Sequence, residues 1–297
     1  MMRLLLLFLV ILAMPIAAGA QTFNWFAATM TSGESGSEHA SVMVIPESSW
    51  VQSDSSLSLS AAAKIRVEEA RGRGLRVVAS VGSARSEQAL RLLWDGAVDG
   101  LIVPAGALMA PVSRPEMSVV LSDMAAGQTV DRSLDGILAD APRYEGDWSA
   151  LDSIFASRAP TASRQTPSDE IAVIDSQSGE ASLFLPGSIL ISGSVPDSWA
   201  DLLAFRAAHP AIGGGLHERL TGTPYAFYRG KRLSRDVTDE VVVVSGVQGT
   251  ARINVSTVFE DNEVVREVLT GKMTIVSYGQ VSFQAGPTGL LLIELVQ

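Results

Sequence analysis

The chain of 297 residues has room for one large domain, or for one large and one small domain. It carries 32 Asp and Glu against 22 Lys and Arg, a formal charge of -10, which excludes the basic stripe that nucleic-acid binding needs. It has no Cys and only three His, so disulfides and thiolate metal sites are excluded and a zinc site is not expected. We therefore expect no metal and no other cofactor.

The first 20 residues have the pattern of an export signal. One Arg precedes a long apolar run, and Ala18-Gly19-Ala20 has the small-x-small form of a cleavage site. The alternative is an uncleaved anchor, but a membrane span needs about 20 apolar residues and this run is shorter. We expect cleavage after Ala20 and a periplasmic or secreted protein without a membrane span.

Helix and strand patterns alternate over the first two thirds of the chain. Ser60 predicts an N-cap for a helix over 61–71, and Leu90, Leu93 and Trp94 predict a second helix over 87–94 that turns Trp94 toward the core. Apolar runs predict eight strands, at 23–29, 41–46, 75–81, 101–104, 117–121, 136–139, 171–175 and 188–192.

The alternation of strands and helices predicts a parallel sheet with right-handed crossovers. Eight strands fit a (β/α)8 barrel of the TIM type. The connection between 175 and 188 is too short for a full helical crossover, and the later half is poor in helices. We therefore expect an abridged or distorted barrel.

The pattern changes after a helix that we predict over 198–209. Pro210 ends this helix, and Gly213-Gly214-Gly215 predicts a hinge. Short apolar runs separated by turns follow at 225–229, 240–245, 250–255, 264–269, 273–276, 280–283 and 289–295. This spacing predicts a C-terminal antiparallel β-sandwich. The expected organisation is a signal peptide at 1–20, a barrel domain at 21–212 and a β-sandwich domain at 213–297.

The segment 94–106, WDGAVDGLIVPAG, resembles the fourth barrel strand of the α-amylase family of glycoside hydrolases. The family pattern there is roughly Gly-Val-Asp-Gly-Phe-Arg-x-Asp-Ala. This chain keeps Asp99-Gly100, has Ile102 at the position of the Arg, and has Pro104 at the position of the nucleophilic Asp. We expect Asp99 itself to have a structural role at a turn.

Two further motifs resemble barrel strands of the same family. The segment GLRVVASVGSAR, 74–85, is similar to the third-strand motif, with Ser80 in place of an Asp and Arg85 in place of the sugar-contacting His. The segment VIDSQSG, 173–179, is similar to the seventh-strand motif that ends Asn-His-Asp. Gln177 then replaces the His, and Ser178 replaces the Asp that stabilises the transition state.

The rest of the resemblance follows the family order. The acid/base Glu of the fifth strand corresponds to Ser122 in SVVLSDM, with Asp123 or Glu116 nearby. The segment LPGSILISG, 185–193, resembles the eighth strand, and LLAFRAAHPAIGGG, 202–215, resembles the helix that links the barrel to the C-terminal domain. We expect His209 in that helix to pack between the two domains.

Retaining glycoside hydrolysis needs two carboxyl groups roughly 5 Å apart. The resemblance implies Pro104, Ser122 and Ser178 at the catalytic positions, so we expect no catalysis by this mechanism. The favoured function is therefore carbohydrate binding or an accessory role in glycan metabolism by an exported pseudoenzyme. One alternative is a protein-interaction subunit of an envelope complex or transporter, because the family includes inactive partners of membrane transporters. The other is an active glycoside hydrolase with relocated carboxylates.

Exposed aromatic side chains are the other candidates for oligosaccharide binding, because sugar rings stack on them. Trp50, Tyr144 and Trp148 fall in loops expected after strands. The alternative for each is packing in the core.

Overall fold

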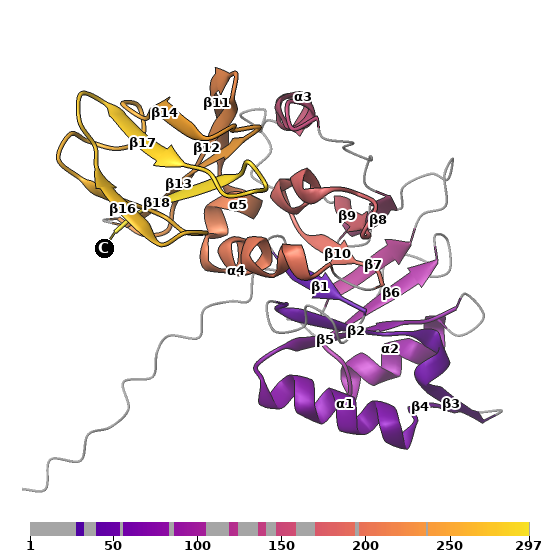
Figure 1. The fold of residues 1–297 in the computed structure, drawn as a ribbon. Helices are drawn as coiled ribbons and strands as arrows, with labels where there is room; N and C mark the ends of the chain where they lie inside the picture. Colours follow the sequence, from indigo (N-terminus) through magenta and orange to yellow (C-terminus); the bar gives the residue numbers. More distant parts are fainter. Residues whose placement is uncertain are drawn as a thin grey trace, which may run out of the picture.

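The computed structural model describes residues 28–32, 40–53, 56–82, 86–104, 119–123, 136–140, 147–158, 170–193, 196–235 and 237–296. The predicted signal peptide, Arg85 and Tyr144 lie outside these ranges. Parallel strands and helices come first in the chain, and antiparallel strands follow them (Figure 1). Among the described residues, no helix has both the length and the hydropathy that a bilayer span requires.

Eight parallel strands of the described chain form a closed barrel. They are β1 (Thr29–Thr31), β2 (Val42–Ile45), β5 (Arg76–Ser80), β6 (Gly100–Pro104), β7 (Val119–Asp123), β8 (Gly136–Asp140), β9 (Glu170–Ile174) and β10 (Ile189–Ile191). Neighbours in this order pair in parallel, and β1 closes the ring by pairing with both β2 and β10. The expectation of a parallel sheet built from eight strands is confirmed. The first strand covers 29–31, whereas most of the expected range, 23–27, lies outside the described residues.

Alternate positions of the strands fill the barrel interior, because successive side chains of a strand point to opposite faces. Every strand contributes at least one residue to this buried apolar cluster, which contains Met30, Val42, Val44, Val78, Ile102, Leu121, Leu138, Ile171 and Leu190. The opposite faces of β2, β5 and β6 pack against α1 (Ala61–Gly72) and α2 (Ser86–Trp94). Ser60 caps α1 as predicted, since its side chain accepts a hydrogen bond from the backbone N–H of Ala63 at 3.2 Å.

The connection after β2, where we expected Trp50 to lie in a loop, is a β-hairpin. The Ser-rich segment 52–60 lies mostly in β3 (Trp50–Ser53) and β4 (Ser56–Leu59), which pair antiparallel after the short 3-10 helix η2 (Glu47–Ser49). Leu57 and Leu59 pack against the cluster that covers α1 and α2. The alternation Ser-Leu-Ser-Leu at 56–59 has the period of a strand. The high serine content of the segment, which is typical of loops, hides this pattern.

The helical layer is reduced on the side of the last two barrel strands. Between β9 and β10 the chain forms only the 3-10 helix η4 (Glu180–Phe184), all of it half-buried or buried. Before β9, the helix α3 (Ala150–Arg158) lies beside the C-terminal strands (Figure 1). After β10, η5 (Asp197–Trp199) and α4 (Ala200–Ala208) follow, and α4 packs on η4. This part of the barrel is abridged, as the short 175–188 connection predicts.

The predicted glycine hinge is part of a short helix. Gly213 and Gly214 lie in α5 (Pro210–Gly214), and Gly215 then leads into β11. A Cβ atom at Gly215 would lie 2.5 Å from the carbonyl oxygen of Ala211 and 2.7 Å from that of Gly230. The glycine is therefore required for close backbone packing, which a run of glycines in sequence does not distinguish from flexibility.

The C-terminal region is built on a six-stranded antiparallel sheet of order β11-β12-β13-β18-β15-β16, with a two-stranded β14-β17 sheet beside it. The bounds are β11 (Leu216–Gly222), β12 (Tyr225–Arg232), β13 (Thr238–Ser245), β14 (Thr250–Asn254), β15 (Val264–Glu267), β16 (Lys272–Ile275), β17 (Gln280–Gln284) and β18 (Leu291–Leu295). Residues of β14 and β17 share a core with one face of the larger sheet. The antiparallel character is as predicted, the second layer has only two strands, and β11 was not predicted.

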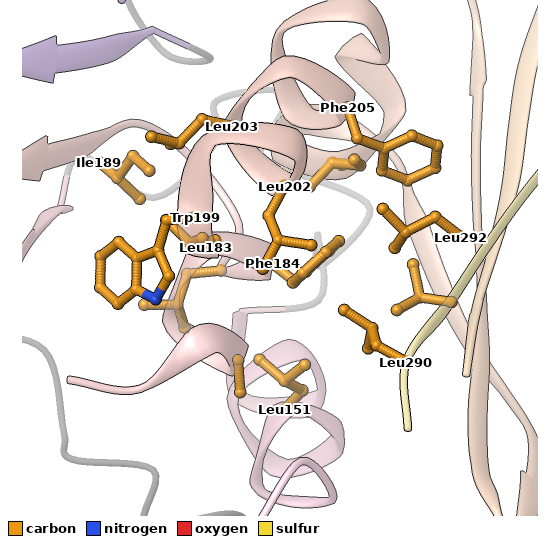
Figure 2. Packing of buried hydrophobic residues seen from close by; sticks show 14 of the residues in the cluster. Leu151, Leu183, Phe184, Ile189, Trp199, Leu202, Leu203, Phe205, Leu290 and Leu292 are labelled. Atoms are coloured by element: carbon orange, nitrogen blue, oxygen red, sulfur yellow. The ribbon is translucent and has the colours of Figure 1, made fainter. Parts of the chain in front are cut away.

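The other face of the six-stranded sheet packs against the barrel region. Figure 2 shows Phe184 of η4 and Leu202 and Phe205 of α4 near Leu290 and Leu292, the last of them in β18. Leu151 of α3 belongs to the same cluster. We call this cluster the junction core; it buries apolar surface from both regions, and we therefore expect the two to unfold together.

His209 lies in the junction, between α4 and α5. Its Nδ1 is 2.7 Å from Asp239 Oδ1 and its Nε2 is 2.7 Å from Glu294 Oε2. Arg266 Nε donates to Glu294 Oε1 at 2.8 Å, which completes a chain of alternating charge. Burial opposes the imidazolium form, but the two carboxylates outweigh it and raise the pKa of His209. His209 therefore packs between the two regions, as expected.

Candidate functional site

The carboxyl ends of the barrel strands form the candidate site, because barrels of this type bind ligands there. In the described residues this end includes Ser80, which closes β5, and Pro104, which closes β6. The backbone register pairs Pro104 with Asp123, the last residue of β7. The fourth-strand and fifth-strand positions of the family resemblance therefore lie side by side.

The fourth-strand position presents apolar groups. Ile102 is 3% exposed and belongs to the barrel interior cluster. Pro104 follows two residues later and is half-buried. Proline has neither a nucleophilic side-chain atom nor a backbone N–H. The end of β6 therefore offers no group that could attack a sugar.

The segment that resembles the seventh-strand motif forms a turn after β9, and hydrogen bonds within the turn hold its side chains. The carboxylate of Asp175 accepts hydrogen bonds from the backbone N–H of Gln177 at 2.9 Å and from Ser178 Oγ at 3.1 Å. Ser178 Oγ in turn accepts from the backbone N–H of Asp175 at 3.0 Å. Ser178 is buried and Gln177 is exposed. The hydroxyl of Ser178 thus stabilises the turn after β9.

The third-strand position is covered by the hairpin. The indole N–H of Trp50 donates to the carbonyl oxygen of Ser80 at 3.1 Å. Just beyond β5, Glu47 lies against Gly82, since a Cβ atom there would be 2.5 Å from Glu47 Oε1. Asp99, at the opposite end of β6, accepts from the backbone N–H of Val77 at 2.9 Å, in keeping with its predicted structural role.

Carboxylate residues follow several strands at the same end of the barrel. Asp123 and Asp140 are the last residues of β7 and β8, and Asp175 follows β9. Ser122 stands next to Asp123 in β7, opposite Val103 in the register. Asp123 was expected near the fifth-strand position, whereas Asp140 was missed, although it closes the sixth barrel strand and the same argument locates it. The described residues contain no group of three His, Asp or Glu arranged to hold a metal ion.

The aromatic candidates do not lie together at this end. Trp50 is 7% exposed and packs in the cluster around α1 and α2, so its ring faces are covered. Trp148 is half-buried in the turn before α3, with its ring centroid 5.3 Å from that of Phe184 and 6.5 Å from that of Phe227. The prediction that Trp94 is buried is wrong, because its side chain is 59% exposed at the end of α2. Leu92 and Leu93 occupy the buried side of that helix instead.

Comparison with known proteins identifies the fold. No protein-family model and no curated protein sequence matches the chain. Among solved structures, an α-amylase from Geobacillus thermoleovorans complexed with acarbose is similar over 93% of this chain and 99% of its own, with a TM-score of 0.60 and 9% identity. An Anoxybacillus α-amylase and AmyP in complex with maltose each give a TM-score of 0.56 at 10% identity, over 87% of both chains. The chain therefore has an α-amylase-like glycoside hydrolase fold.

Proposed function

We propose that this protein binds oligosaccharides on its amylase-like barrel and does not hydrolyse them by the retaining mechanism. The observation that carries the proposal is Pro104 at the carboxyl end of β6, where the family resemblance implies the nucleophile. Covalent catalysis needs an oxygen, sulfur or nitrogen nucleophile at that point. An apolar side chain, Ile102, stands at the position of the neighbouring Arg.

The turn after β9 supports the proposal. Ser178 corresponds to the transition-state-stabilising Asp, and its hydroxyl is engaged with Asp175. A serine carries no negative charge with which to stabilise an oxocarbenium-like transition state. Removing one such electrostatic group typically lowers the rate by about 10² to 10³, and removing several members of a catalytic unit lowers it further.

We infer an α-glucan as the ligand class, because the structures with this fold include complexes with maltose and acarbose. We further propose that this binding occurs in the periplasm or outside the cell, which the signal-peptide pattern of residues 1–20 supports. The role would then be accessory, such as retaining or presenting glycans for other proteins.

The test combines a binding assay with a hydrolysis assay on the same purified protein. We expect maltotriose and longer maltodextrins to give a saturable calorimetric signal and to release no reducing sugar. A commercial α-amylase under the same conditions is the positive control for hydrolysis. The absence of binding to a broad glycan panel would contradict the proposal.

Hydrolysis would contradict it in a different way. The relevant variants are Asp123→Asn, Asp140→Asn and Asp175→Asn, which remove the carboxylates at the ends of β7, β8 and β9. Release of reducing sugar by the parent protein, abolished by any of these changes, would identify an active glycoside hydrolase with relocated carboxylates. Asp99→Asn is the matched control, because Asp99 lies at the other end of the barrel strands.

A second candidate function, a protein-interaction subunit of an envelope complex, is favoured by an apolar strip at the edge of the six-stranded sheet. Met273 is 59% and Ile275 58% exposed on β16, and Val264, the register partner of Ile275, is 38% exposed. Contiguous exposed apolar surface is typical of interaction sites. Met273→Lys with Ile275→Lys should abolish capture of a partner from envelope fractions, whereas Leu216→Lys on the opposite edge strand should not. Equal capture by all variants would contradict this candidate.

A further inference from the structure

The helix α3 follows a barrel strand in the chain but docks on the C-terminal sheet (Figure 1). Leu151 is fully buried in the junction core. The helix has only nine residues, which is too short for stability by itself, so its position depends on these contacts.

Asp152 makes the polar contacts that hold α3 in place. Its Oδ1 accepts hydrogen bonds from Tyr225 Oη at 2.7 Å and from His217 Nε2 at 2.9 Å, and its Oδ2 accepts from Arg219 Nη1 at 3.3 Å. His217 and Arg219 lie in β11, and Tyr225 begins β12. One carboxylate of the helix therefore connects it to two strands.

Phe155, one turn further along α3, covers the side chains of His217 and Arg229. Its ring stacks on that of His217 with centroids 4.5 Å apart, and the guanidinium carbon of Arg229 lies 3.5 Å from its centroid. Arg229 is 0% exposed, and among the described residues its Nε and Nη1 have no hydrogen-bond partner. His217 Nδ1 is also buried without a partner.

Two opposing effects therefore act on the docked position of α3. Burying a guanidinium group without a compensating anion is unfavourable, and Arg206 lies close enough to Arg229 to add repulsion. Displacement of Phe155 would return water to Arg229 and His217. The hydrogen bonds of Asp152 and the aromatic stacking oppose this displacement.

We propose that α3 is an acid-sensitive latch, which Asp152 holds over His217 and Arg229 and which protonation of His217 releases. This inference is independent of the proposed function. An imidazolium in the docked state would lie buried beside the permanent charge of Arg229. In the released state, water solvates it.

The electrostatics give the direction of the response. Burial and the nearby Arg229 lower the pKa of His217 to about 4, although Asp152 acts in the opposite sense. Burial favours the neutral form of Asp152, but hydrogen bonds from His217 and Tyr225 and the charges of His217 and Arg219 outweigh it and lower its pKa. Between about pH 6.5 and 4 the docked state binds fewer protons than the released state. Each unit of acidification in that window therefore raises the released fraction by up to about tenfold. Tyr225 stays neutral throughout this window, because burial raises its pKa.

Hydrogen–deuterium exchange tests the latch in the full chain. We compare the backbone amides of 150–158 at pH 7.5 and pH 5.0 after correction for intrinsic exchange rates. We expect a loss of protection of up to about 30-fold at pH 5.0, while the amides of α1 and β13 keep theirs. Unchanged protection of α3 would overturn the proposal. Parallel loss in α3, α1 and β13 would also overturn it, because that result indicates global unfolding.

Variants separate the role of Asp152, which holds α3 in place, from that of His217, which gives the response to pH. Asp152→Asn should lower the protection of α3 at both pH values. His217→Phe keeps an aromatic ring against Phe155 but cannot titrate, so the protection of α3 should no longer depend on pH. Glu218→Gln is the matched control, because it neutralises an exposed carboxylate next to His217 in β11. A Glu218→Gln effect as large as that of Asp152→Asn, or a pH response that survives in His217→Phe, would refute the latch.

Discussion

The carboxyl end of the barrel and the junction with the C-terminal sheet differ in how they use polar residues. At the barrel end, the residues that the family resemblance aligns with catalytic positions include Pro104 and Ser178, and Ser178 stabilises a turn. At the junction, His209, Arg206 and Asp152 make charged hydrogen bonds across elements distant in the chain. The described charge network of this protein therefore supports domain packing.

This difference shows that charged side chains of the described chain serve packing between its two regions, whereas the barrel interior is apolar. The interior of the barrel is filled by apolar side chains. Ile102 contributes to this filling at the position where the family pattern has an Arg. The junction depends on particular pairs of atoms, and substitutions there change folding. The following changes test the comparison in order of expected effect.

The junction core should dominate stability. Phe184 is 0% exposed and contacts Trp148 and Phe227, with ring centroids 5.3 Å and 6.1 Å away. Phe184→Ala should lower the free energy of unfolding by about 3–5 kcal/mol, because it leaves a cavity between the two regions. Denaturation in urea measures this. A loss below about 1 kcal/mol would contradict the expected dominance of the junction core.

Replacement by Met should change the free energy of unfolding differently at the two buried arginines, Arg206 and Arg229. Arg206 donates from Nη1 to the carbonyl oxygens of Leu183 and Leu185 at 2.7 and 3.1 Å, and from Nη2 to that of Gly187 at 2.6 Å. Arg206→Met leaves these acceptors unpaired and should cost about 3 kcal/mol.

Arg229→Met provides the comparison. Arg229 donates only to the carbonyl oxygen of Phe184 within the described residues, and its charge lacks a carboxylate partner there. Replacement of such a group by an apolar side chain is often neutral or stabilising. Urea denaturation of both variants measures the free energy of unfolding. Equal losses of stability in Arg206→Met and Arg229→Met would contradict the expected difference.

His209 should make junction stability depend on pH. Its folded-state pKa is raised above about 6.5, the value of an exposed His, so its contribution is complete below about pH 6.5 and is lost as the pH rises through the folded-state value. His209→Gln should cost about 1–3 kcal/mol at pH 6. The difference from the parent protein should shrink toward pH 9 in thermal unfolding. A difference that grows with pH would contradict this assignment.

The smallest effect is expected at the exposed end of α2. Trp94 is 59% exposed, so Trp94→Ser should change the free energy of unfolding by no more than about 0.5 kcal/mol. Leu93→Ser, on the adjacent buried position, is the contrasting change and should cost several times more. Similar losses for both would restore the original prediction that Trp94 belongs to the core.

Much of the barrel could be predicted from local pattern. The strands at 41–46, 75–81 and 101–104 follow from short apolar runs with turns on either side, and the helix at 61–72 follows from Ser60 and its spacing. The hairpin at 50–59 was missed because its serines resemble a loop. Trp94 was misplaced because its periodicity is compatible with the edge of an apolar face as well as with its centre.

By itself, the sequence determined the parallel character of the first strands and the change to antiparallel strands after Pro210, because these depend on residue type and local period. Only the tertiary structure decided that β1 pairs with both β2 and β10 to close the barrel, that α3 docks on β11, and that His209 joins Asp239 to Glu294. Those contacts unite residues tens to hundreds of positions apart. Their free energy arises from burial and geometry that no local window of sequence contains.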